Sequence, residues 1–200
     1  MANIRHYPTE WISSWPLGRH DHLTLRPILP QDALPLSRML QALSPRARQC
    51  RFHGGINTAS TQLLQGLTEV DFDHHMAFVV THRELNVEVI VAEARYVRDT
   101  ADAEAAEFAL LVDERWQRHG IGRRILGTLT HAARAQRLRW LHGEVLSDNR
   151  PMLALMQGCR FACTPHREDD GLVCAEKCLD KAAEKLPSAW RRWLAHGVAA

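Results

Sequence analysis

A short segment with two glycines, placed between a predicted strand and a predicted helix, constrains the fold of this chain more than any other feature. The strand is predicted at 107–113, where most residues are apolar, and the helix from Ile121 to about Gln136. The segment between them is Gln117-Arg118-His119-Gly120-Ile121-Gly122-Arg123. Glycines one residue apart let the backbone turn tightly and approach a ligand closely. The amides that open the helix then point at this ligand, at the positive end of the helix dipole, and this geometry binds phosphate.

Two common classes of phosphate-binding loop do not match this segment. The dinucleotide fingerprint requires a third glycine three residues after Gly122, where this chain has Ile125. The P-loop requires Gly-Lys followed by Ser or Thr, which the chain lacks. Arg118, Arg123 and Arg124 nevertheless lie within reach of a diphosphate. The segment therefore predicts a phosphate-binding loop of another class.

The composition is that of an ordinary soluble globular protein. A chain of 200 residues with 46% apolar and 24% charged residues suits one domain with a real core. A formal net charge of +2 with dispersed arginines argues against a dedicated nucleic-acid binder. No apolar run approaches the ~20 residues of a membrane span, and the N-terminus lacks the apolar core of a signal peptide. We therefore expect a cytoplasmic protein that binds neither nucleic acid nor membrane.

The five cysteines are expected to be free thiols, because their number is odd and nothing indicates an oxidising compartment. Four of them form two C-x3-C pairs, Cys159 with Cys163 and Cys174 with Cys178. Zinc sites prefer C-x2-C, so we expect buried structural cysteines on two neighbouring strands and no metal.

The order of predicted elements extends the strand–loop–helix pattern in both directions. A strand at 23–28 precedes three helices, which begin near Asp32 as a cap, at Ser44-Pro45 and at Thr61. Strands at 76–81 and 87–97 then lead to the glycine segment. A strand at 140–146, a helix from Asn149 to 157, and two closing strands around a loop at 167–171 complete the order.

The glycine segment resembles the acetyl-CoA loop of the GNAT N-acetyltransferases, Gln/Arg-x-x-Gly-x-Gly/Ala, which is met by Gln117, Gly120 and Gly122. The order of elements is also that of the GNAT fold. Further stretches are similar to the Pat-type protein lysine acetyltransferases: Leu25-Arg26-Pro27-Ile28, Leu43-Ser44-Pro45, Ala106-Glu107-Phe108-Ala109, Trp116 to Gly122, Glu144-Val145-Leu146 and Asn149-Arg150-Pro151-Met152-Leu153.

This resemblance implies an α/β (α+β) GNAT fold, with a mixed central sheet of about six to seven strands flanked by about four helices. The GNAT domain is expected at 23–180, after an N-terminal extension at 1–22 and before a C-terminal helical tail at 181–200. Trp11 and Trp15, like Trp190 and Trp193, are expected in helical segments. These segments either fold back on the core or form the contact of a homodimer.

The resemblance also implies the site. The coenzyme A diphosphate would lie on Gln117, Arg118, His119, Gly120, Ile121, Gly122 and Arg123. A backbone amide near Leu111 or Val112 would meet the thioester oxygen, and Asn149 would also contact the cofactor. The family match places a catalytic glutamate at Glu107.

The chemistry explains why a glutamate is needed there. A free lysine amine has a pKa near ~10.4, so making it neutral at pH 7 costs about 4–5 kcal/mol. A carboxylate can accept this proton directly or through water. The alternative interpretation of Glu107 is a surface glutamate at the start of a strand.

Many GNAT enzymes carry a tyrosine acid on the helix after Asn149, where this chain has Met156. Because the only tyrosines are Tyr7 and Tyr96, we expect the thiolate to leave without a side-chain acid.

A few other polar residues allow two interpretations. His74 and His75 are expected to be solvated loop residues rather than metal ligands. Glu144 either orients the substrate or is a buried, hydrogen-bonded strand residue. Three arginines of the second helix either flank the acceptor groove or form a solvated face: Arg46, Arg48 and Arg51.

These observations predict an acetyl-CoA-dependent N-acetyltransferase that uses no metal and acts on a primary amine, either a protein lysine or a small amine. The alternative is a non-catalytic acyl-CoA-binding module with a regulatory role. The acceptor does not follow from the sequence, because the loops expected to select it, 46–58 and 167–171, carry no motif that is tied to a substrate.

Overall fold

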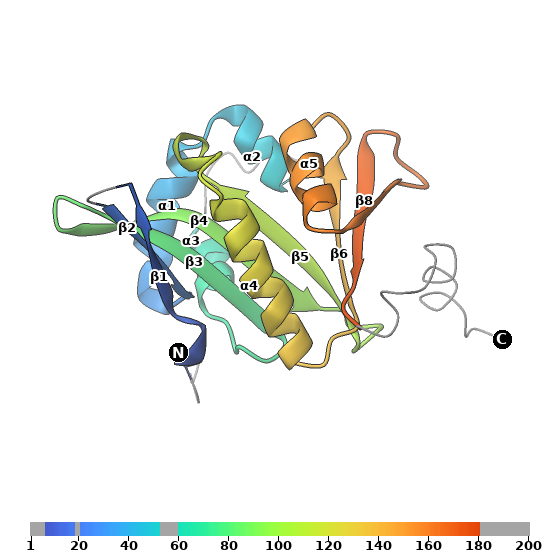
Figure 1. Cartoon of the computed structure of the whole chain (residues 1–200), viewed down its shortest axis with the longest axis horizontal. Coiled ribbons are helices and arrows are strands. Elements are labelled where there is room, and N and C mark those ends of the chain that lie inside the picture. Colours follow the sequence, from blue (N-terminus) through green and yellow to red (C-terminus); the bar gives the residue numbers. More distant parts are fainter. Residues whose placement is uncertain (1–6, 19–20, 53–59, 181–200) are drawn as a thin grey trace. The chain divides into compact units, whose positions relative to one another are not determined.

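The computed structural model describes residues 7–18, 21–52 and 60–180. The chain divides into two compact units, one formed by residues 1–97 and 108–129 and the other by residues 98–107 and 130–200. Strand β5 (Ala105–Val112) and helix α4 (Ile121–Ala135), both labelled in Figure 1, each include residues of both units. The predicted C-terminal tail with Trp190 and Trp193 lies outside the described residues.

The described residues form five α-helices and one mixed sheet of eight strands. The strand order is β1-β2-β3-β4-β5-β6-β8-β7. This agrees with the expected mixed sheet flanked by helices, and the sheet has one strand more than the six to seven that were expected. No helix in the described part of the chain combines the length and the apolar character needed to cross a membrane.

Four antiparallel strands form most of the sheet in the first unit. They are β1 (Ser13–Leu17), β2 (Asp21–Pro27), β3 (His75–Glu84) and β4 (Val87–Arg98). Helices α1 (Ala33–Ala42) and α3 (Thr61–Thr68) lie behind these strands in Figure 1, and the first part of α4, residues 121–129, lies in front of them. Helix α2 (Pro45–Phe52) follows α1.

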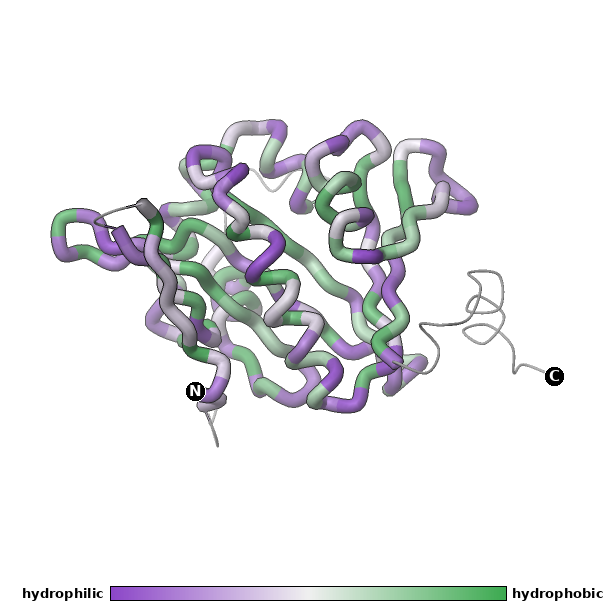
Figure 2. Tube along the Cα trace, viewed as in Figure 1, coloured by the Kyte–Doolittle hydropathy of each residue, from purple (hydrophilic) through white to green (hydrophobic). Residues whose placement is uncertain are grey.

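Burial explains why the central strands are almost continuously apolar. Residues 76–81 of β3 and 90–96 of β4 are buried, and Figure 2 shows apolar residues concentrated along these strands. A strand that is covered on both faces needs apolar side chains on both, so the usual alternation disappears. The edge strand β1 alternates between half-buried and exposed residues instead.

The second unit holds the remaining strands and one helix. Strand β6 (Trp140–Leu146) is parallel to β5 and antiparallel to β8 (Leu172–Cys178), which pairs with β7 (Ala162–Pro165). Helix α5 (Arg150–Gly158) connects β6 to β7. The predicted strand at 140–146 is confirmed to the residue.

Three sequence predictions about local structure are wrong. Trp15 lies in strand β1 rather than in a helix, because residues 13–17 pair with β2. Asp32 precedes α1 but does not cap it with its side chain, which instead accepts hydrogen bonds from Arg26 and from the Leu29 amide. Cys159 follows α5 as its C-cap residue rather than lying on a strand.

The other cysteine predictions are confirmed only in part. All five thiols are free, and three lie on the expected pair of strands. Cys178 is buried, whereas the others are only half-buried.

Candidate functional site

Hydrogen bonds of Asp113 hold the turn that follows strand β5. The Asp113 amide donates to the Val91 carbonyl at 2.9 Å. The Asp113 carboxylate, which is buried, accepts from the amide and the guanidinium of Arg115. A short 3-10 turn, Glu114–Trp116, follows. The position of the next residues is therefore set by the end of the strand.

In the predicted phosphate-binding loop, two side chains form hydrogen bonds with backbone carbonyls. The Gln117 Nε2 donates to the Val112 carbonyl at 3.2 Å. The His119 Nδ1 lies 2.8 Å from the Gln117 carbonyl, at which it can only donate. The side chains of Gln117 and His119 therefore shape the loop, and the loop presents its backbone to solvent.

Two residues of this loop have a left-handed backbone. Gly120 has φ +76°, which glycine adopts without strain, and Arg118 has φ +64°, which is uncommon for a residue with a side chain. A Cβ atom added at Gly120 would meet no atom within 4 Å. The backbone at Gly120 thus faces open space, and a ligand can approach it.

Helix α4 begins where the sequence predicted. Its first hydrogen bond runs from the Arg124 amide to the Gly120 carbonyl at 3.1 Å, so the amides of Ile121 and Gly122 precede the helical ladder. The side chains of Arg118 and Arg123 are exposed here, whereas Ile121 is buried in the core. Exposed cationic side chains and helix-opening amides are the groups that bind anions in other proteins.

The last residues of β5 are less exposed than the loop. Leu111 is buried and Val112 is half-buried. The Arg124 guanidinium, which the sequence placed within reach of a diphosphate, lies 4.2 Å from the ring centre of Trp15 in β1.

In the second unit, Glu107 is an exposed residue of β5. It lies directly opposite His142 of the parallel strand β6. The His142 Nε2 is 2.8 Å from the Asp99 Oδ2. The sequence did not indicate His142 or Asp99, because no local pattern reports the register of two strands separated by a helix.

Asn149 opens helix α5, as predicted. Its Oδ1 accepts from the Met152 amide at 3.3 Å, so this oxygen serves the helix. Met156 is fully buried, and Cys159 at the other end of the helix is half-buried.

The two tyrosines of the chain lie outside α5. The Tyr7 hydroxyl donates to the Pro27 carbonyl, and Tyr96 is fully buried in β4.

Helix α2 is held by polar contacts rather than by burial, since none of its residues is buried. Ser44 caps it through the Ala47 amide. The amide and hydroxyl of Ser44 donate to the Glu114 carboxylate, at 3.0 and 2.9 Å. At the other end of the helix, Arg51 lies 3.4 Å from Glu93 of β4. Of the three arginines on this helix, Arg46 is exposed, whereas Arg48 and Arg51 are half-buried.

A buried ionic cluster surrounds Glu93. Arg95 pairs with Glu93 and donates to the Leu67 carbonyl. Burial opposes ionisation of Glu93, but the charges of Arg95 and Arg51 outweigh it and hold the pKa of the carboxyl below its usual range. His75 accepts from Arg95 at 3.0 Å, and burial together with the Arg95 charge lowers the pKa of His75 to about 4. His75 is thus a structural acceptor and not the solvated residue that the sequence suggested.

Glu144 is not the buried strand residue of one of the two interpretations. Its side chain is exposed on β6, and its Oε1 lies 3.5 Å from the His166 Nε2. Among the residues that the structure describes, no group of three or more His, Cys, Asp and Glu side chains is arranged to hold a metal ion.

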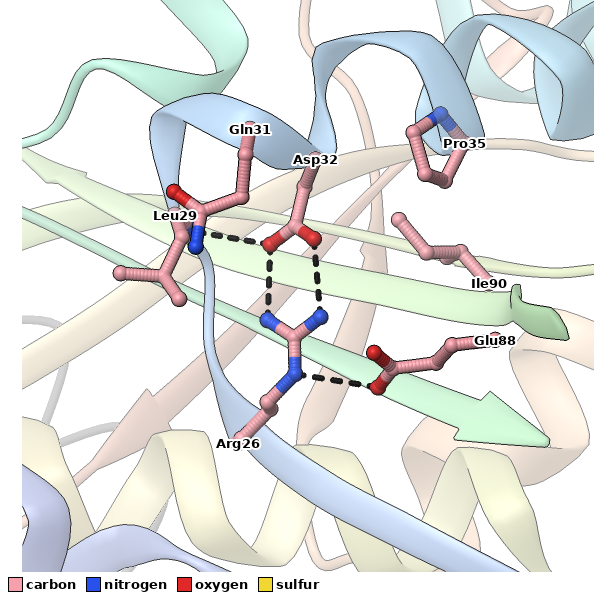
Figure 3. Close-up of a pocket in the computed structure, with 7 residues that line it drawn as sticks. All are labelled: Arg26, Leu29, Gln31, Asp32, Pro35, Glu88 and Ile90. Carbon is pink, nitrogen blue, oxygen red and sulfur yellow. Dashed lines mark hydrogen bonds and ion pairs between the residues drawn. The ribbon is translucent and has the colours of Figure 1, made fainter. Parts of the chain in front are cut away.

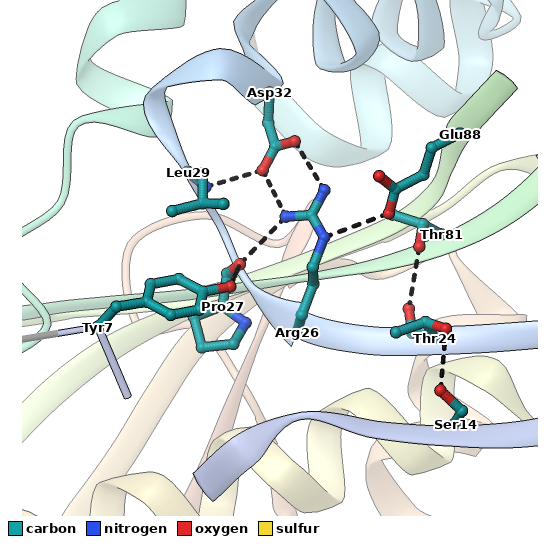
Figure 4. Close-up of polar contacts among 9 residues, drawn as sticks. All are labelled: Tyr7, Ser14, Thr24, Arg26, Pro27, Leu29, Asp32, Thr81 and Glu88. Carbon is teal, nitrogen blue, oxygen red and sulfur yellow. Dashed lines mark hydrogen bonds and ion pairs between the residues drawn. The ribbon is translucent and has the colours of Figure 1, made fainter. Parts of the chain in front are cut away.

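A pocket of about 240 Å³ lies beside α1 in the first unit (Figure 3). Arg26 points into it and is already paired with the carboxylates of Asp32 and Glu88, at 2.7 and 3.2 Å. Figure 4 shows that Arg26 also donates to the Pro27 carbonyl, which the Tyr7 hydroxyl shares. The single guanidinium of this pocket is thus paired with two carboxylates, and it offers no unpaired positive charge to a phosphate.

Comparisons with known proteins agree with this geometry. Residues 38–161 match the acetyltransferase (GNAT) family. The acetyltransferase Pat of Mycolicibacterium smegmatis is 32% identical over 152 residues, which make up 76% of this chain and 44% of that protein. The chain thus spans less than half the length of this relative.

Two solved structures have the same fold. The GNAT domain of PAT from S. lividans is 25% identical with a TM-score of 0.77, covering 86% of this chain and 99% of that one. The yncA protein of Salmonella typhimurium, solved with its cofactor acetyl-CoA, is 18% identical with a TM-score of 0.59, covering 80% and 95% of the two chains. The second likeness concerns the fold alone. With more than half of its length matched to the family, this chain is a member of the GNAT acetyltransferases.

Proposed function

We propose that this chain transfers the acetyl group of acetyl-CoA to a primary amine, either a protein lysine or a small amine. The observation that carries the proposal is the loop between β5 and α4. It combines a left-handed Gly120 that faces open space, helix-opening amides at Ile121 and Gly122, and exposed arginines. An anion the size of a diphosphate satisfies these groups.

The coenzyme would bind along the path from this loop back to β5. Its diphosphate lies against residues 117–123, and a backbone amide at Leu111 or Val112 meets the thioester oxygen. A donor that is fixed in place before the reaction stabilises this oxygen as negative charge develops on it. The side-chain nitrogen of Asn149, Nδ2, remains available to the cofactor, because the α5 cap uses only the side-chain oxygen.

Glu107 is the proposed general base. It lies on the strand that leads to the loop, four residues before Leu111, and its carboxylate is exposed. It takes a proton from the acceptor ammonium, and the neutral amine attacks the thioester carbon. The coenzyme A thiolate is a good leaving group, and the described part of α5 presents no tyrosine, serine or free histidine to protonate it.

Labelled acetyl-CoA and a panel of acceptors test this proposal. The protein is incubated with amines, amino acids and lysine-containing proteins, and both free thiol and labelled product are measured. We expect thiol release that depends on an amine, with label in an amide. If the protein binds acetyl-CoA but transfers no label to any acceptor, it is a non-catalytic acyl-CoA-binding module instead.

A further inference from the structure

We propose that His142, oriented by Asp99, is a proton-relay residue that receives the proton Glu107 takes from the acceptor. This inference rests on the proposed function and adds two residues to its machinery. Three observations in the second unit carry it: the register of β5 and β6, the hydrogen bond between His142 and Asp99, and the exposure of the groups involved.

The register places His142 beside Glu107. The two residues are Cα partners in the parallel pair of β5 and β6. Paired strands lie about 4.8 Å apart, and partner residues project from the same face of the sheet. The burial patterns agree, since Ala106 and Leu141, one residue earlier on each strand, are both buried. One water molecule is enough to connect a glutamate carboxylate with an imidazole over this spacing.

Asp99 fixes which nitrogen of His142 carries the hydrogen. The Nε2 lies 2.8 Å from the Asp99 carboxylate, which only accepts hydrogen bonds. Neutral His142 therefore keeps its hydrogen on Nε2 and has a lone pair on Nδ1. The same logic orients the histidine of a serine-protease triad, where a carboxylate on one nitrogen prepares the other as a base.

The exposure of this group suits a relay to solvent. The side chain of His142 is 39% exposed and that of Asp99 is 28% exposed. Two further carboxylates occupy positions on the same face: Glu144, two residues along β6, and Glu176, the partner of His142 on β8. A proton that reaches His142 thus has carboxylates on both neighbouring strands and water beside it.

The step balances without any further reactant. One N–H bond of the acceptor ammonium breaks as an O–H bond forms on Glu107. This proton passes to the Nδ1 of His142 and then to water, which restores both groups. The amine attacks, the C–S bond breaks, and the second proton of the attacking nitrogen goes to the coenzyme A thiolate. Imidazole is in general a stronger base than a carboxylate, which is the order that a relay from a glutamate to a histidine requires.

The test compares His142→Gln and Asp99→Asn with the wild-type protein. The glutamine amide can still donate to Asp99, but it offers no basic lone pair. An asparagine at 99 can donate to Nε2, which moves the hydrogen to Nδ1. We expect each change to lower kcat about 10-fold or more near pH 7, with unchanged acetyl-CoA affinity and a loss that shrinks as pH rises. As a matched control, His74→Gln removes an exposed histidine beside Asp71 and should leave the profile unchanged.

Nitrogen NMR of labelled histidine adds a readout that a purely structural role would not move. Neutral His142 should carry its hydrogen on Nε2 in the wild-type protein and on Nδ1 in Asp99→Asn. A wild-type pH profile in a folded His142→Gln variant would overturn the relay, and so would a wild-type tautomer with hydrogen on Nδ1. If Glu107→Gln lowers the rate and His142→Gln does not, the relay is wrong and the proposed function stands. If the wild-type protein transfers no acetyl group, both are wrong.

Discussion

Backbone conformation at single residues decides what the loop after β5 can bind. Gly120 sits at φ +76° with open space where a side chain would begin, and two residues later Gly122 lies in the first turn of α4. Both positions bring the backbone close to the proposed diphosphate. Their effect on binding can be separated from their effect on the helix.

Gly122→Glu should abolish acetyl-CoA binding, because the side chain would bring bulk and negative charge to the space of the phosphates. Gly127→Glu is the matched control, since Gly127 is an exposed glycine of the same helix with no atom within 4 Å of an added Cβ. Calorimetric titration of the folded variants measures both affinities. Wild-type affinity in Gly122→Glu would exclude the loop as the binding site.

Helix α5 should supply no acid to the reaction. Met156 is fully buried, so Met156→Leu keeps a similar volume and should cost less than about 1.5 kcal/mol of stability. Cys159→Ala removes the thiol at the C-terminal end of this helix. Both variants should keep kcat within a few-fold of the wild-type value in steady-state assays. A hundred-fold drop in Cys159→Ala, with folding and cofactor affinity intact, would reveal an acid.

His75 should make the protein less stable in mild acid. Its pKa is 6.5 in the unfolded chain and about 4 in the folded protein, so between these values the unfolded chain binds more protons. The free energy of unfolding therefore falls as pH drops through this window, by about 2 kcal/mol from pH 7 to pH 5. Denaturant unfolding of His75→Gln, which still accepts from Arg95, should show this part of the pH dependence removed. An equal pH dependence in both proteins would contradict the assignment.

At the scale of single elements, α2 has no buried residue and is fastened at both ends by ion pairs and hydrogen bonds. At its start, Ser44 bonds to Glu114, which lies in the turn just before the proposed phosphate-binding loop. At its end, Arg51 reaches the buried Glu93. Exposed polar contacts of the first kind contribute about 1 kcal/mol or less, so they set the position of a helix more than they stabilise the fold.

Glu114→Gln should loosen α2 without unfolding the protein. The change weakens the bonds from Ser44, so the amides of residues 47–52 should exchange with deuterium several-fold faster, while global stability falls by about 1 kcal/mol or less. Hydrogen-exchange mass spectrometry measures the first effect and denaturant unfolding the second. Glu104→Gln, which breaks an exposed pair with Arg139, is the control and should leave α2 unchanged. Unaltered exchange in Glu114→Gln would show that Ser44 does not hold the helix.

The elements that the sequence predicted well are those whose signals are local. The strand 140–146, the cap at Asn149 and the start of α4 each follow from residues within one turn or one strand. Strand β1 could not be predicted in this way. Its residues include two serines and a proline, and it becomes a strand only because β2 is available to pair with it.

The same limit applies to the site. The sequence located the turn between β5 and α4 because its two glycines are only one residue apart, and it indicated Glu107 because this residue belongs to the strand that enters the turn. The pairing of Glu107 with His142 depends on the register of two parallel strands, and the Arg26–Asp32 pair replaces a local cap by a contact between a strand and a turn. Neither arrangement leaves a periodic signal in the sequence.

At the scale of the whole molecule, β5 joins the parts of the chain to which the activity is assigned. The strand begins in the second unit, where it carries Glu107, and ends in the first unit, where it leads into the proposed phosphate-binding loop. A single strand thus connects the proposed base to the proposed cofactor site along the chain.

The rate of acetyl transfer by wild-type protein and Glu107→Gln, measured from neutral pH to about pH 10, tests this account most directly. The glutamine keeps the shape of the side chain and removes the base. At neutral pH the variant should lose about 10²-fold or more in kcat, with unchanged acetyl-CoA affinity. Near pH 10 much of the acceptor amine is already neutral, so part of the loss should be recovered. A Glu107→Gln variant that transfers acetyl groups at the wild-type rate over the whole range would contradict the account.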